Sequence, residues 1–486
     1  MSIIALIDKY LEDLMEERNN FIDDLNQFPN FEKQVRRLSN ELASGILSLT
    51  LSEADELIRN SGLRKDGYSI QRKDDRSLIS SVGDFHFQHT LFKDKATGRY
   101  HYLLDELMSL PDKERLTSEA EAIMLNEAEV HSYQHAAEAI SVGSQKVSKT
   151  TVMNKVHAVE DEFPEPIFEQ ETEKKHCRFL YLEADEDHIH RQQDGKIAGC
   201  MVGKLIYLFE GKEDVYKGKR TLVHPFYFAG LYQGSEMNQK LWDKVQQYID
   251  EHYDTDYLET VYLTSDGGAW IQTGVDTLYK CKPVIDRFHM TKYINRASRL
   301  TGDKDKENDY KQRFYKYIYK DKLLAAKKLL GRIRSMNFGN ANAEDFLDQC
   351  LSYFENNWDA IQRAYRDKNT LGSSTEGHVS NVLSDRMSSR PMGWSETGSD
   401  RMCKLRCFIR NHGRDKVVDL VRYRRELACQ QHAATGTDGM IDPIQRKQYS
   451  KKQREDYVYI ERMHATLESG STVRKILAIR EQLGGI

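Results

Sequence analysis

Hydrophobic residues recur every three to four positions through residues 1–60, and acidic residues occupy many of the positions between them. Ile4, Ile7 and Leu11 begin this stripe, which breaks at Arg18. The spacing is that of amphipathic α-helices, whose apolar face packs against another element. The sequence therefore predicts a helical N-terminus, and packing onto the rest of the chain is favoured over a dimeric coil.

The pattern changes between residues 82 and 102, where apolar and polar residues alternate. The turn-forming residues Ala96, Thr97 and Gly98 separate two such stretches, which predicts a β-hairpin. We expect residues 1–115 to form one mainly helical region that includes this hairpin.

Two or three helices are predicted within residues 116–160. Small alanines at 136 and 137 allow helices to cross closely, as in a helix-turn-helix DNA-binding motif, and Ser148 is placed to cap a second helix. The connection at 141–147 is longer than the usual turn of that motif, so an ordinary helical hairpin is the alternative. If the pair binds DNA, the candidate contacts are Ser148, Lys149 and Thr151.

An acidic, proline-containing linker at residues 161–175 precedes a change to strand-like patterns. Three strands, a helix, a strand, a helix and a strand follow in that order, which predicts a ribonuclease-H-like α/β core. Residues 176–290 are its first part. Residues 291–370 are predicted to be a basic all-helical insertion, and residues 371–486 to complete the core and add C-terminal helices. The strands are expected at 178–185, 204–209, 221–229, 260–264 and 283–285.

The composition fits a globular protein of about three domains or fewer, with 486 residues, 39% of them hydrophobic and 30% charged. No apolar run approaches the ~20 residues that cross a membrane, and the first residues lack signal-peptide features. The seven cysteines are scattered without a Cys-x-x-Cys pair, which argues against a disulfide framework and a zinc finger. We therefore expect a cytoplasmic protein that does not contact a membrane.

Charge is unevenly distributed, although the net charge is only −5. Residues 160–187 contain 3 basic and 11 acidic residues, a net of −8, whereas residues 287–334 contain 15 basic and 5 acidic residues, a net of +10. Residues 386–426 have a net of +6, from 11 basic and 5 acidic residues. Such segregation is consistent with a surface that binds a polyanion, but solvated helix surfaces cause it more often.

Two aspartates stand at the predicted ends of core strands, near the centre of the expected sheet. Asp185 is expected to end the first strand, and Asp266 to end the strand after the long helix, where glycines follow it. Carboxylates at such strand ends suit Mg²⁺ or Mn²⁺. The alternatives are a solvated acidic cluster for Asp185 and a turn residue for Asp266. Asp187 shares the strand face of Asp185, so periodicity does not choose between them.

Glu376 follows the predicted insertion within the sequence SSTEGHV. The serines and threonine before it favour a helix start, which would place Glu376 in a first helical turn facing the sheet. A glutamate in that position is also explained by the helix dipole alone.

Other candidates have weaker support from the residues themselves. His188 and His190, beside the acids of the first strand, lack the further ligands of a transition-metal site. Trp394, with Arg386 and Arg390, is a candidate for stacking on or binding a DNA end, and the alternative is that Trp394 anchors a loop in the interior.

Four segments resemble sequences of the ISLre-type insertion-sequence transposases, a family formerly known only as uncharacterised bacterial proteins. They are YLEADEDHIHRQ (181–192), YLTSDGGAWIQTG (262–274), VIDRFHMTKYINRA (284–297) and EGHVSNVLSDRMSSRPMGWSETGSDRM (376–402). The similarity extends over essentially the whole chain, and it includes the helical pair upstream of the core.

The resemblance implies a DDE transposase, in which two aspartates and one glutamate on a ribonuclease-H-like core hold two Mg²⁺ (or Mn²⁺) ions. Asp185, Asp266 and Glu376 match these places, 81 and 110 positions apart along the chain. The long second gap is similar to the helical insertion of Mutator-like and hAT-like transposases. Asp286 and His289 match a supporting signature, and Asp187 remains the alternative to Asp185.

The implied function is cleavage of element ends and their transfer to target DNA. The partners implied are the terminal repeats and the target, bound by at least a homodimer in the DNA complex. We expect the basic insertion to contact the phosphate backbone of the DNA, and the candidate residues are Arg287, Lys292, Arg313 and Lys316. The rival functions are a non-transposing nuclease on the same fold and a DNA-binding regulator with a decayed catalytic core.

Overall fold

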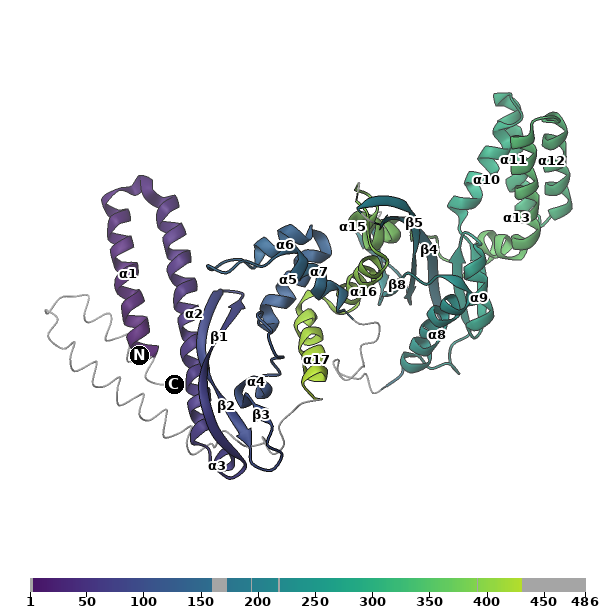
Figure 1. Ribbon diagram of the computed structural model, residues 1–486. Helices are drawn as coiled ribbons and strands as arrows, with labels where there is room; N and C mark the ends of the chain where they lie inside the picture. The colour runs from purple at the N-terminus through teal and green to yellow at the C-terminus, as the bar shows by residue number, and fades with distance from the viewer. Residues whose placement is uncertain (1–2, 160–172, 194, 217–218, 391, 431–486) are drawn as a thin grey trace. The chain divides into compact units, whose positions relative to one another are not determined.

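The computed structural model describes residues 3–159, 173–193, 195–216, 219–390 and 392–430 (Figure 1). The described chain divides into two compact units, each assembled from separate stretches of sequence. Of the described residues, the first unit contains 3–123, 138–147 and 421–430, and the second contains 124–137 and those between 148 and 420. Most of the predicted acidic linker at 161–175 lies outside the described residues.

Two long helices lie side by side in the first unit, as predicted for residues 1–60 (Figure 1). The rings of Phe21 and Phe31 stack with their centroids 5.0 Å apart where the two helices meet. Pro29 stands in the first turn of the second helix, where its missing N–H leaves no helical bond unmade. The helices of this segment are α1 (Ile3–Asp23), the short η1 (Leu25–Gln27), α2 (Phe28–Asn60) and α3 (Gly62–Gly67).

The hairpin of the first unit differs from the prediction in its position. The main hairpin joins β1 (Tyr68–Ser80) to β2 (Gly83–Asp94), whereas the predicted turn at 96–98 leads only into the two-residue β3 (Tyr100–His101). Residues 69–77 of β1 are mostly polar and largely exposed, so they carry no clear strand pattern. Strand β2 packs on α2, and α4 (Leu103–Leu107) closes the same core.

Three helices follow, as predicted for residues 116–160. They are α5 (Ser118–Val130), α6 (Tyr133–Ala139) and α7 (Lys149–His157). The Ser148 hydroxyl caps α7 by accepting a hydrogen bond from the Thr151 N–H at 3.1 Å, as the sequence predicts. Val152 and Val156 are fully buried, and the connection between α6 and α7 is as long as expected.

The second unit is built on a mixed five-stranded sheet in the order β10-β9-β4-β5-β8. Strands β4, β5 and β8 are antiparallel neighbours, whereas β4, β9 and β10 run parallel to one another. The order of strands and helices along the chain agrees with the prediction. The elements are β4 (Phe179–Gln193), β5 (Lys196–Phe209), β8 (Phe226–Gly230), α8 (Gly234–His252), β9 (Thr260–Ser265), α9 (Ala269–Thr277) and β10 (Cys281–Ile285).

Two strand boundaries were predicted wrongly. Strand β4 continues to Gln193, so Asp185 lies within the strand and does not end it. The strand expected at 221–229 is broken at His224, which has a φ of 47°, and at Pro225. Its first half, β7 (Lys219–Val223), pairs with β6 (Gly211–Tyr216) in a separate hairpin. Proline cannot donate to a sheet ladder, and a left-handed residue before it turns the chain.

The two faces of the sheet have different partners. On one face, Leu182, Ile206 and Leu263 form a buried core with Trp242 of α8 and Ile271 of α9. On the other face, Tyr262 and Val284 pack against Ala364. We call this second face the acid face, because strand alternation also places Glu183, Asp185 and Asp187 on it.

Residues 287–366, which follow β10 along the chain, are entirely helical apart from short turns, as predicted for the insertion, and Figure 1 shows their helices as one bundle. Their shared core contains Phe314, Leu330, Leu347 and Phe354, all nearly inaccessible to solvent. The helices are α10 (Arg287–Arg299), α11 (Lys304–Tyr319), α12 (Leu323–Met336) and α13 (Ala341–Arg366).

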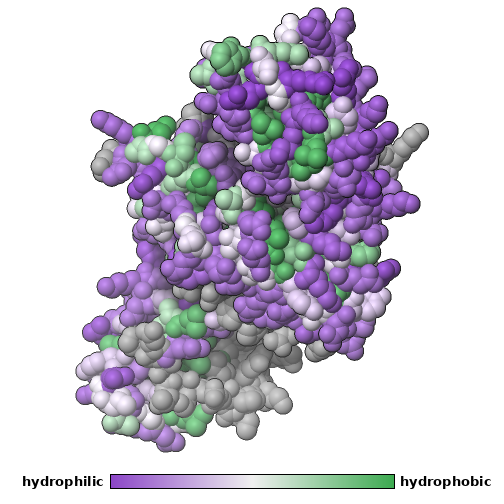
Figure 2. All heavy atoms as spheres, turned by 90° about the vertical axis from the view of Figure 1, so that its right-hand side faces the viewer, coloured by the Kyte–Doolittle hydropathy of each residue, from purple (hydrophilic) through white to green (hydrophobic). Residues whose placement is uncertain are grey.

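The chain then returns to β4 with its next two helical segments, and four more follow them. They are α14 (Thr375–Val379), the π-helical η3 (Ser380–Ser384), α15 (Asp385–Met387), α16 (Glu396–His412), η4 (Arg414–Lys416) and α17 (Val417–Gln430). No helix among the described residues is both long and apolar enough to span a bilayer. On the face drawn in Figure 2, hydrophilic side chains are in the majority and hydrophobic ones gather only in small groups.

Candidate active site

The register of three parallel strands sets three aspartates in one row. Glu183 of β4 and Val284 of β10 both pair with Thr264 of β9. Two positions further along the chain stand Asp185, still within β4, and Asp266 and Asp286, which directly follow the last residues of β9 and β10. Because side chains alternate along a strand, these residues point to the same face as Glu183. The pairing therefore brings Asp185 and Asp266 together, although Asp185 does not end its strand.

The Asp185 carboxyl group is held in an environment that disfavours its charge. Burial is the largest cause that raises the pKa of Asp185, and the negative charge of Asp266 raises it further, whereas His289 acts in the opposite direction. Its oxygen Oδ1 accepts a hydrogen bond from the Glu186 N–H at 2.9 Å. A half-buried carboxylate repelled by a second one is relieved by a divalent cation, so this pair fits an Mg²⁺ or Mn²⁺ ion.

Asp266 is fixed by the turn that follows β9. Its Oδ1 accepts the Gly268 N–H at 2.8 Å, and Gly267 has a φ of 91°. A side chain at 267 would also stand only 3.0 Å from the Asn357 amide of α13. Glycine is therefore required at 267 both for the backbone conformation and for the close approach of α13.

Glu183 is the hydrogen-bonding centre of the acid face, a role that the sequence analysis did not recognise. It is 2% exposed and accepts hydrogen bonds from the Tyr207 hydroxyl at 2.5 Å, the Ser374 N–H at 2.8 Å and the Thr375 hydroxyl at 2.7 Å. Lys212 adds an ion pair at 3.3 Å. Only the period-2 pattern of residues 183, 185 and 187 hinted at this residue, because its donors are distant in sequence.

Asp187 has a structural role in the described chain. It accepts hydrogen bonds from the hydroxyls of Ser384 at 3.1 Å and Ser388 at 2.6 Å. Glu183 and Asp187 thus bind the two ends of residues 373–388, which lie across β4 between them. Asp185 stands between these two anchors.

Glu376 lies in this covering segment, in the first turn of α14 as the sequence predicts. The side chain is exposed and has no hydrogen-bond partner among the described residues. The structure brings the backbone of α14 to β4, but it does not bring the Glu376 carboxylate into contact with Asp185 or Asp266.

Asp286 and His289 stand at the start of the insertion. Asp286 is buried, caps α10 through the Phe288 N–H at 2.9 Å, and lies 3.4 Å from the Ser373 hydroxyl. His289 is half-buried in the first turn of α10, and its influence on the pKa of Asp185 places it near the aspartate pair. Both residues therefore lie beside the acid face.

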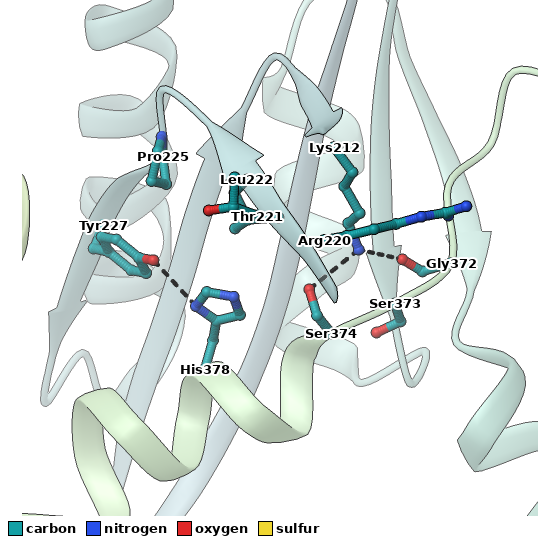
Figure 3. A pocket seen from close by; sticks show the side chains of 10 residues that line it. All are labelled: Lys212, Arg220, Thr221, Leu222, Pro225, Tyr227, Gly372, Ser373, Ser374 and His378. Atoms are coloured by element: carbon teal, nitrogen blue, oxygen red, sulfur yellow. Dashed lines mark hydrogen bonds between the residues drawn. The ribbon is translucent and has the colours of Figure 1, made fainter. Parts of the chain in front are cut away.

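A pocket of about 460 Å³ opens beside Glu183 (Figure 3). Lys212 points into it, and its ammonium group donates to Glu183, to the Gly372 carbonyl and to the Ser374 hydroxyl. The Tyr227 hydroxyl lies 3.1 Å from His378 Nδ1, and burial lowers the pKa of His378. The pocket is lined by Lys212, Arg220, Thr221, Leu222, Pro225, Tyr227, Gly372, Ser373, Ser374 and His378.

The candidate DNA contacts upstream of the core are exposed. Ser148 and Lys149 are accessible at the start of α7, and the Thr151 hydroxyl lies 3.0 Å from the Ser148 hydroxyl. Ser148 is therefore engaged as a helix cap, whereas the Lys149 side chain extends into solvent.

Some of the cations predicted to contact DNA are exposed on the insertion, whereas others are bonded to groups of the protein. The Arg287 guanidinium donates to the Ala364 carbonyl at 2.9 Å. Arg313 forms an ion pair with Asp309 at 2.7 Å, which offsets its charge. Lys292 is exposed with its ammonium over the Phe288 ring, and Lys316 is exposed on α11.

Arg386 and Trp394 are not at the surface, contrary to their candidacy as DNA contacts. They are 5% and 7% exposed, the Arg386 guanidinium lies over the Trp394 ring at 4.8 Å, and it donates to the Ala128 carbonyl. The alternative, in which Trp394 anchors a loop in the interior, agrees with this packing. Arg390 is exposed. Part of the positive charge of residues 386–426 is therefore internal to the fold.

A further group of potential metal ligands escaped the sequence analysis. Glu127, His131 and His135 approach one another around the connection between α5 and α6. Their spacing of four positions was the available signal, but two histidines and a glutamate are too common for that spacing alone to predict a site.

Asp185→Asn is expected to stabilise the metal-free protein at neutral pH. Because the folded state raises the pKa of Asp185, ionisation of this carboxyl lowers stability as the pH rises through that folded pKa. Asparagine carries no charge, so calorimetry in EDTA at pH 8 should show a melting temperature about 2 °C higher, a change below ~1 kcal/mol.

The difference should shrink at pH 5, and Mg²⁺ should raise the melting temperature of the wild type more than that of the variant. A variant less stable at both pH values would show instead that the carboxylate has a stabilising partner.

Comparison with known proteins places this sequence in a defined group. Residues 22–424 match the model of a family described as "Uncharacterised protein family (UPF0236)". A UPF0236 protein of Caldanaerobacter subterraneus subsp. tengcongensis is 32% identical over 402 residues, which cover 82% of each chain. The name of this protein combines eleven gene designations. A second protein of that strain, with four designations, is 31% identical over 397 residues, 81% of this chain and 80% of the relative.

Among solved structures, one similarity is to a chain described as "Drosophila P element transposase strand transfer complex". The identity is 10%, and the match covers 66% of this chain and 92% of the other. The TM-score of 0.22 is too low to establish a common fold.

Proposed function

We propose that this chain, which belongs to the uncharacterised protein family UPF0236, is a DNA transposase of the DDE type. The observation that carries the proposal is the juxtaposition of Asp185, within β4, and Asp266, directly after the neighbouring parallel strand β9, where burial and the charge of Asp266 raise the pKa of Asp185. Their surroundings fit divalent metal ions. Similarity to the ISLre-type transposases supports the same assignment.

The sheet supports a ribonuclease-H-like core as part of the proposal. Three antiparallel strands followed by two parallel strands, with helices between them, is the order that such a core requires. The four-helix bundle enters after β10 and returns the chain to the acid face at α14. An insertion in this place separates the second aspartate from the glutamate along the chain.

In the proposed mechanism, Asp185 and Asp266 hold the metal ions and Glu376 completes the set. When bound, two Mg²⁺ or Mn²⁺ ions supply an activated water and stabilise the leaving oxygen. The water oxygen bonds to phosphorus at the element end, and the 3′ oxygen leaves and takes up a proton to become a hydroxyl. That hydroxyl then attacks a phosphodiester of target DNA and displaces its 3′ oxygen. The Glu376 side chain is exposed and has no hydrogen-bond partner among the described residues. In the proposed mechanism it therefore turns toward the aspartates without breaking such a bond.

The rival functions differ from a transposase in their genetic consequence. A transposase moves or copies its own gene as its direct reaction, whereas a regulator does not. The eleven and four gene designations carried by the names of two relatives agree with genes that have multiplied within one strain. This favours a transposase origin over an ordinary regulator, and a cleavage assay separates an active enzyme from a decayed one.

The direct test supplies the purified full chain with Mg²⁺ and a duplex that carries the DNA flanking its gene. Cleavage at the boundary of the element, with a free 3′ hydroxyl that is then joined to a second duplex, is the expected result. Cleavage without joining would favour the nuclease, and binding without cleavage would favour the regulator. Since two ends must be paired, we propose that at least two copies of the chain act together.

Lys149→Ala is expected to weaken binding to the element end several-fold while leaving random-sequence binding nearly unchanged. The proposal assigns end recognition to α6 and α7, and Lys149 is an exposed cation at the start of α7. Fluorescence anisotropy on both duplexes gives the comparison. Lys240→Ala, on α8 behind the opposite face of the sheet, is the matched control. Equal loss on both duplexes would make Lys149 a non-specific phosphate contact.

A truncation that removes α5, α6 and α7 is a poorer test of DNA recognition, because α5 and α6 pack against buried side chains. Glu129 of α5 and Tyr133 of α6 contact buried side chains of the second unit, so a chain that begins at Lys175 loses packing together with any DNA contact.

Lys316→Ala is expected to flatten the salt dependence of DNA binding by about one unit of slope, since each neutralised phosphate contributes about −0.9 on duplex DNA. Lys316 is exposed on α11, whereas Arg313 is partly neutralised by Asp309. Arg313→Ala should therefore change the slope less. The measurement is log affinity against log salt for both variants. Unchanged slopes for both, with a reduced slope for Arg390→Ala, would place the DNA on the C-terminal segment.

A further inference from the structure

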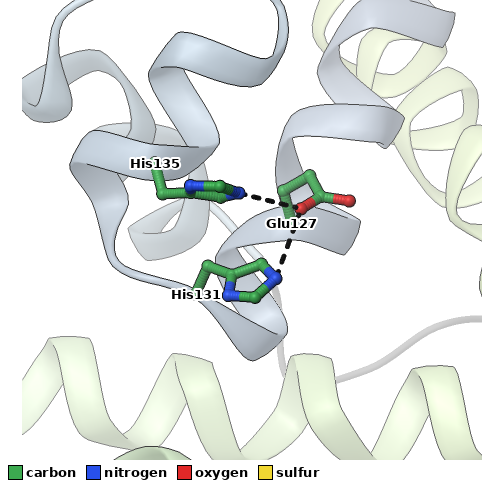
Figure 4. A group of neighbouring side chains, drawn as sticks. All are labelled: Glu127, His131 and His135. Carbon is green, nitrogen blue, oxygen red and sulfur yellow. Dashed lines mark ion pairs between the residues drawn. The ribbon is translucent and has the colours of Figure 1, made fainter.

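Three side chains at the junction of α5 and α6 point toward one another (Figure 4). His131 Nε2 and His135 Nε2 each lie 3.8 Å from the same oxygen, Oε2 of Glu127. The potential ligand atoms of the three residues all lie within 4.8 Å of one another. The two imidazole rings are 4.4 Å apart between centroids.

The two nitrogen–oxygen distances are close to those between ligands of a bound metal ion. Zinc binds histidine nitrogen and carboxylate oxygen at about 2.0–2.2 Å, so two ligands of a tetrahedral ion stand about 3.4 Å apart. The nitrogen–oxygen distances of 3.8 Å exceed this value by a few tenths of an ångström. Rotation of exposed side chains is sufficient to close that difference.

Stability alone does not explain the arrangement. The histidine side chains are 46% and 55% exposed and the Glu127 side chain is 29% exposed. Exposed pairs at nearly 4 Å contribute little to folding. The segment that carries them is nevertheless well braced, because Glu129 is buried, and the Ser132 hydroxyl accepts the His135 N–H at 3.2 Å.

We propose that Glu127, His131 and His135 bind one divalent transition-metal ion, of which Zn²⁺ is the best match. Imidazole nitrogens favour zinc and its neighbours over Mg²⁺, which prefers oxygen ligands. The three protein ligands leave a fourth position open to solvent. The site is therefore distinct in chemistry from the aspartates of the acid face.

The ion joins the last turn of α5 to the first turn of α6, and α6 is the first helix of the proposed DNA-binding pair. Bound zinc thus restricts the angle between α5 and α6. The site itself does not depend on the proposed transposase activity, so a negative result in either experiment leaves the other standing.

The test titrates the metal-free full chain, without a histidine tag, with Zn²⁺ in competition with a chromophoric chelator. We expect one equivalent to bind tightly, in the presence of excess Mg²⁺. His131→Gln and His135→Gln should each weaken that site by more than the roughly 10–100-fold that loss of an outer hydrogen-bond partner causes. Co²⁺ substitution should give the visible absorption of a tetrahedral nitrogen and oxygen site.

His176→Gln is the matched control, because His176 is also exposed and lies 3.6 Å from one carboxylate, Asp254. Cys200→Ser tests the competing pair formed by the Cys200 thiol and His190, which are 3.6 Å apart. Retention of the tight site in both variants supports the proposal. The proposal is overturned if no tight equivalent binds, if His131→Gln and His135→Gln bind as the wild type does, or if Cys200→Ser removes the site. Circular dichroism of each variant verifies folding.

Discussion

Asp266→Asn is expected to abolish metal-dependent DNA cleavage while leaving folding and DNA binding intact. The carboxylate follows β9 directly and its charge acts on Asp185 of the neighbouring strand, so under the proposed mechanism its loss removes a metal ligand. Metal ions supply several kcal/mol of transition-state stabilisation, and a loss of about 4 kcal/mol lowers the rate roughly a thousandfold. The assay follows nicking of an end-bearing duplex under single-turnover conditions, and Asp185→Asn should behave in the same way.

Asp187→Asn supplies the matched control for this expectation. Asp187 lies on the same strand face, but it accepts hydrogen bonds from Ser384 and Ser388. Its variant should lose some stability and retain most of its cleavage activity. Full activity of the Asp266→Asn protein would refute the assignment. If Asp187→Asn is inactive and Asp185→Asn is active, the catalytic role belongs to Asp187.

Glu376→Gln distinguishes the third carboxylate from other acids near the site. We expect a loss similar to that of Asp266→Asn, and no change in the melting temperature without metal, because the Glu376 side chain is exposed and unbonded in the described chain. Asp286→Asn is the comparison, since Asp286 is buried and caps α10. Loss of activity in Asp286→Asn but not in Glu376→Gln would transfer the third position to Asp286.

Glu129→Gln should lower the free energy of unfolding by about 3–5 kcal/mol, the usual consequence of breaking a buried ion pair from one side. Glu129 and Arg406 lie 2.9 Å apart with side chains only 3% and 4% exposed. Burial lowers the pKa of Arg406, and Glu129 is the largest influence that opposes this effect. The variant leaves the guanidinium buried without its counter-ion. Urea unfolding followed by fluorescence gives the measurement.

The matched control is Asp348→Asn, which breaks the exposed Asp348–Arg334 pair of the insertion. That pair has the same 2.9 Å separation with side chains about half exposed. Exposed pairs contribute about 0–1 kcal/mol, so the control should remain near the wild type. Similar small effects from both variants would mean that water reaches Arg406 once Glu129 is neutralised.

Local signals in the sequence predicted the secondary structure of much of the chain. The period of the hydrophobic residues identified the N-terminal helices and the helical insertion, because an amphipathic element repeats its contacts every few residues. The cap at Ser148 and the turn after Asp266 were also predicted, since both depend on neighbours within three residues. Strand β1 was missed, because few of its side chains are buried.

The sequence itself determined the order of the main core strands and helices and singled out Asp185 and Asp266, although it predicted the end of β4 too early. Their alignment on neighbouring strands was decided only by the tertiary structure, through the register of β4 with β9. The roles of Glu183, Asp187 and Arg386 were also decided there, because their partners lie far away in the sequence. Hydrogen bonds and burial between distant segments depend on three-dimensional packing, which a linear pattern of residue types does not specify.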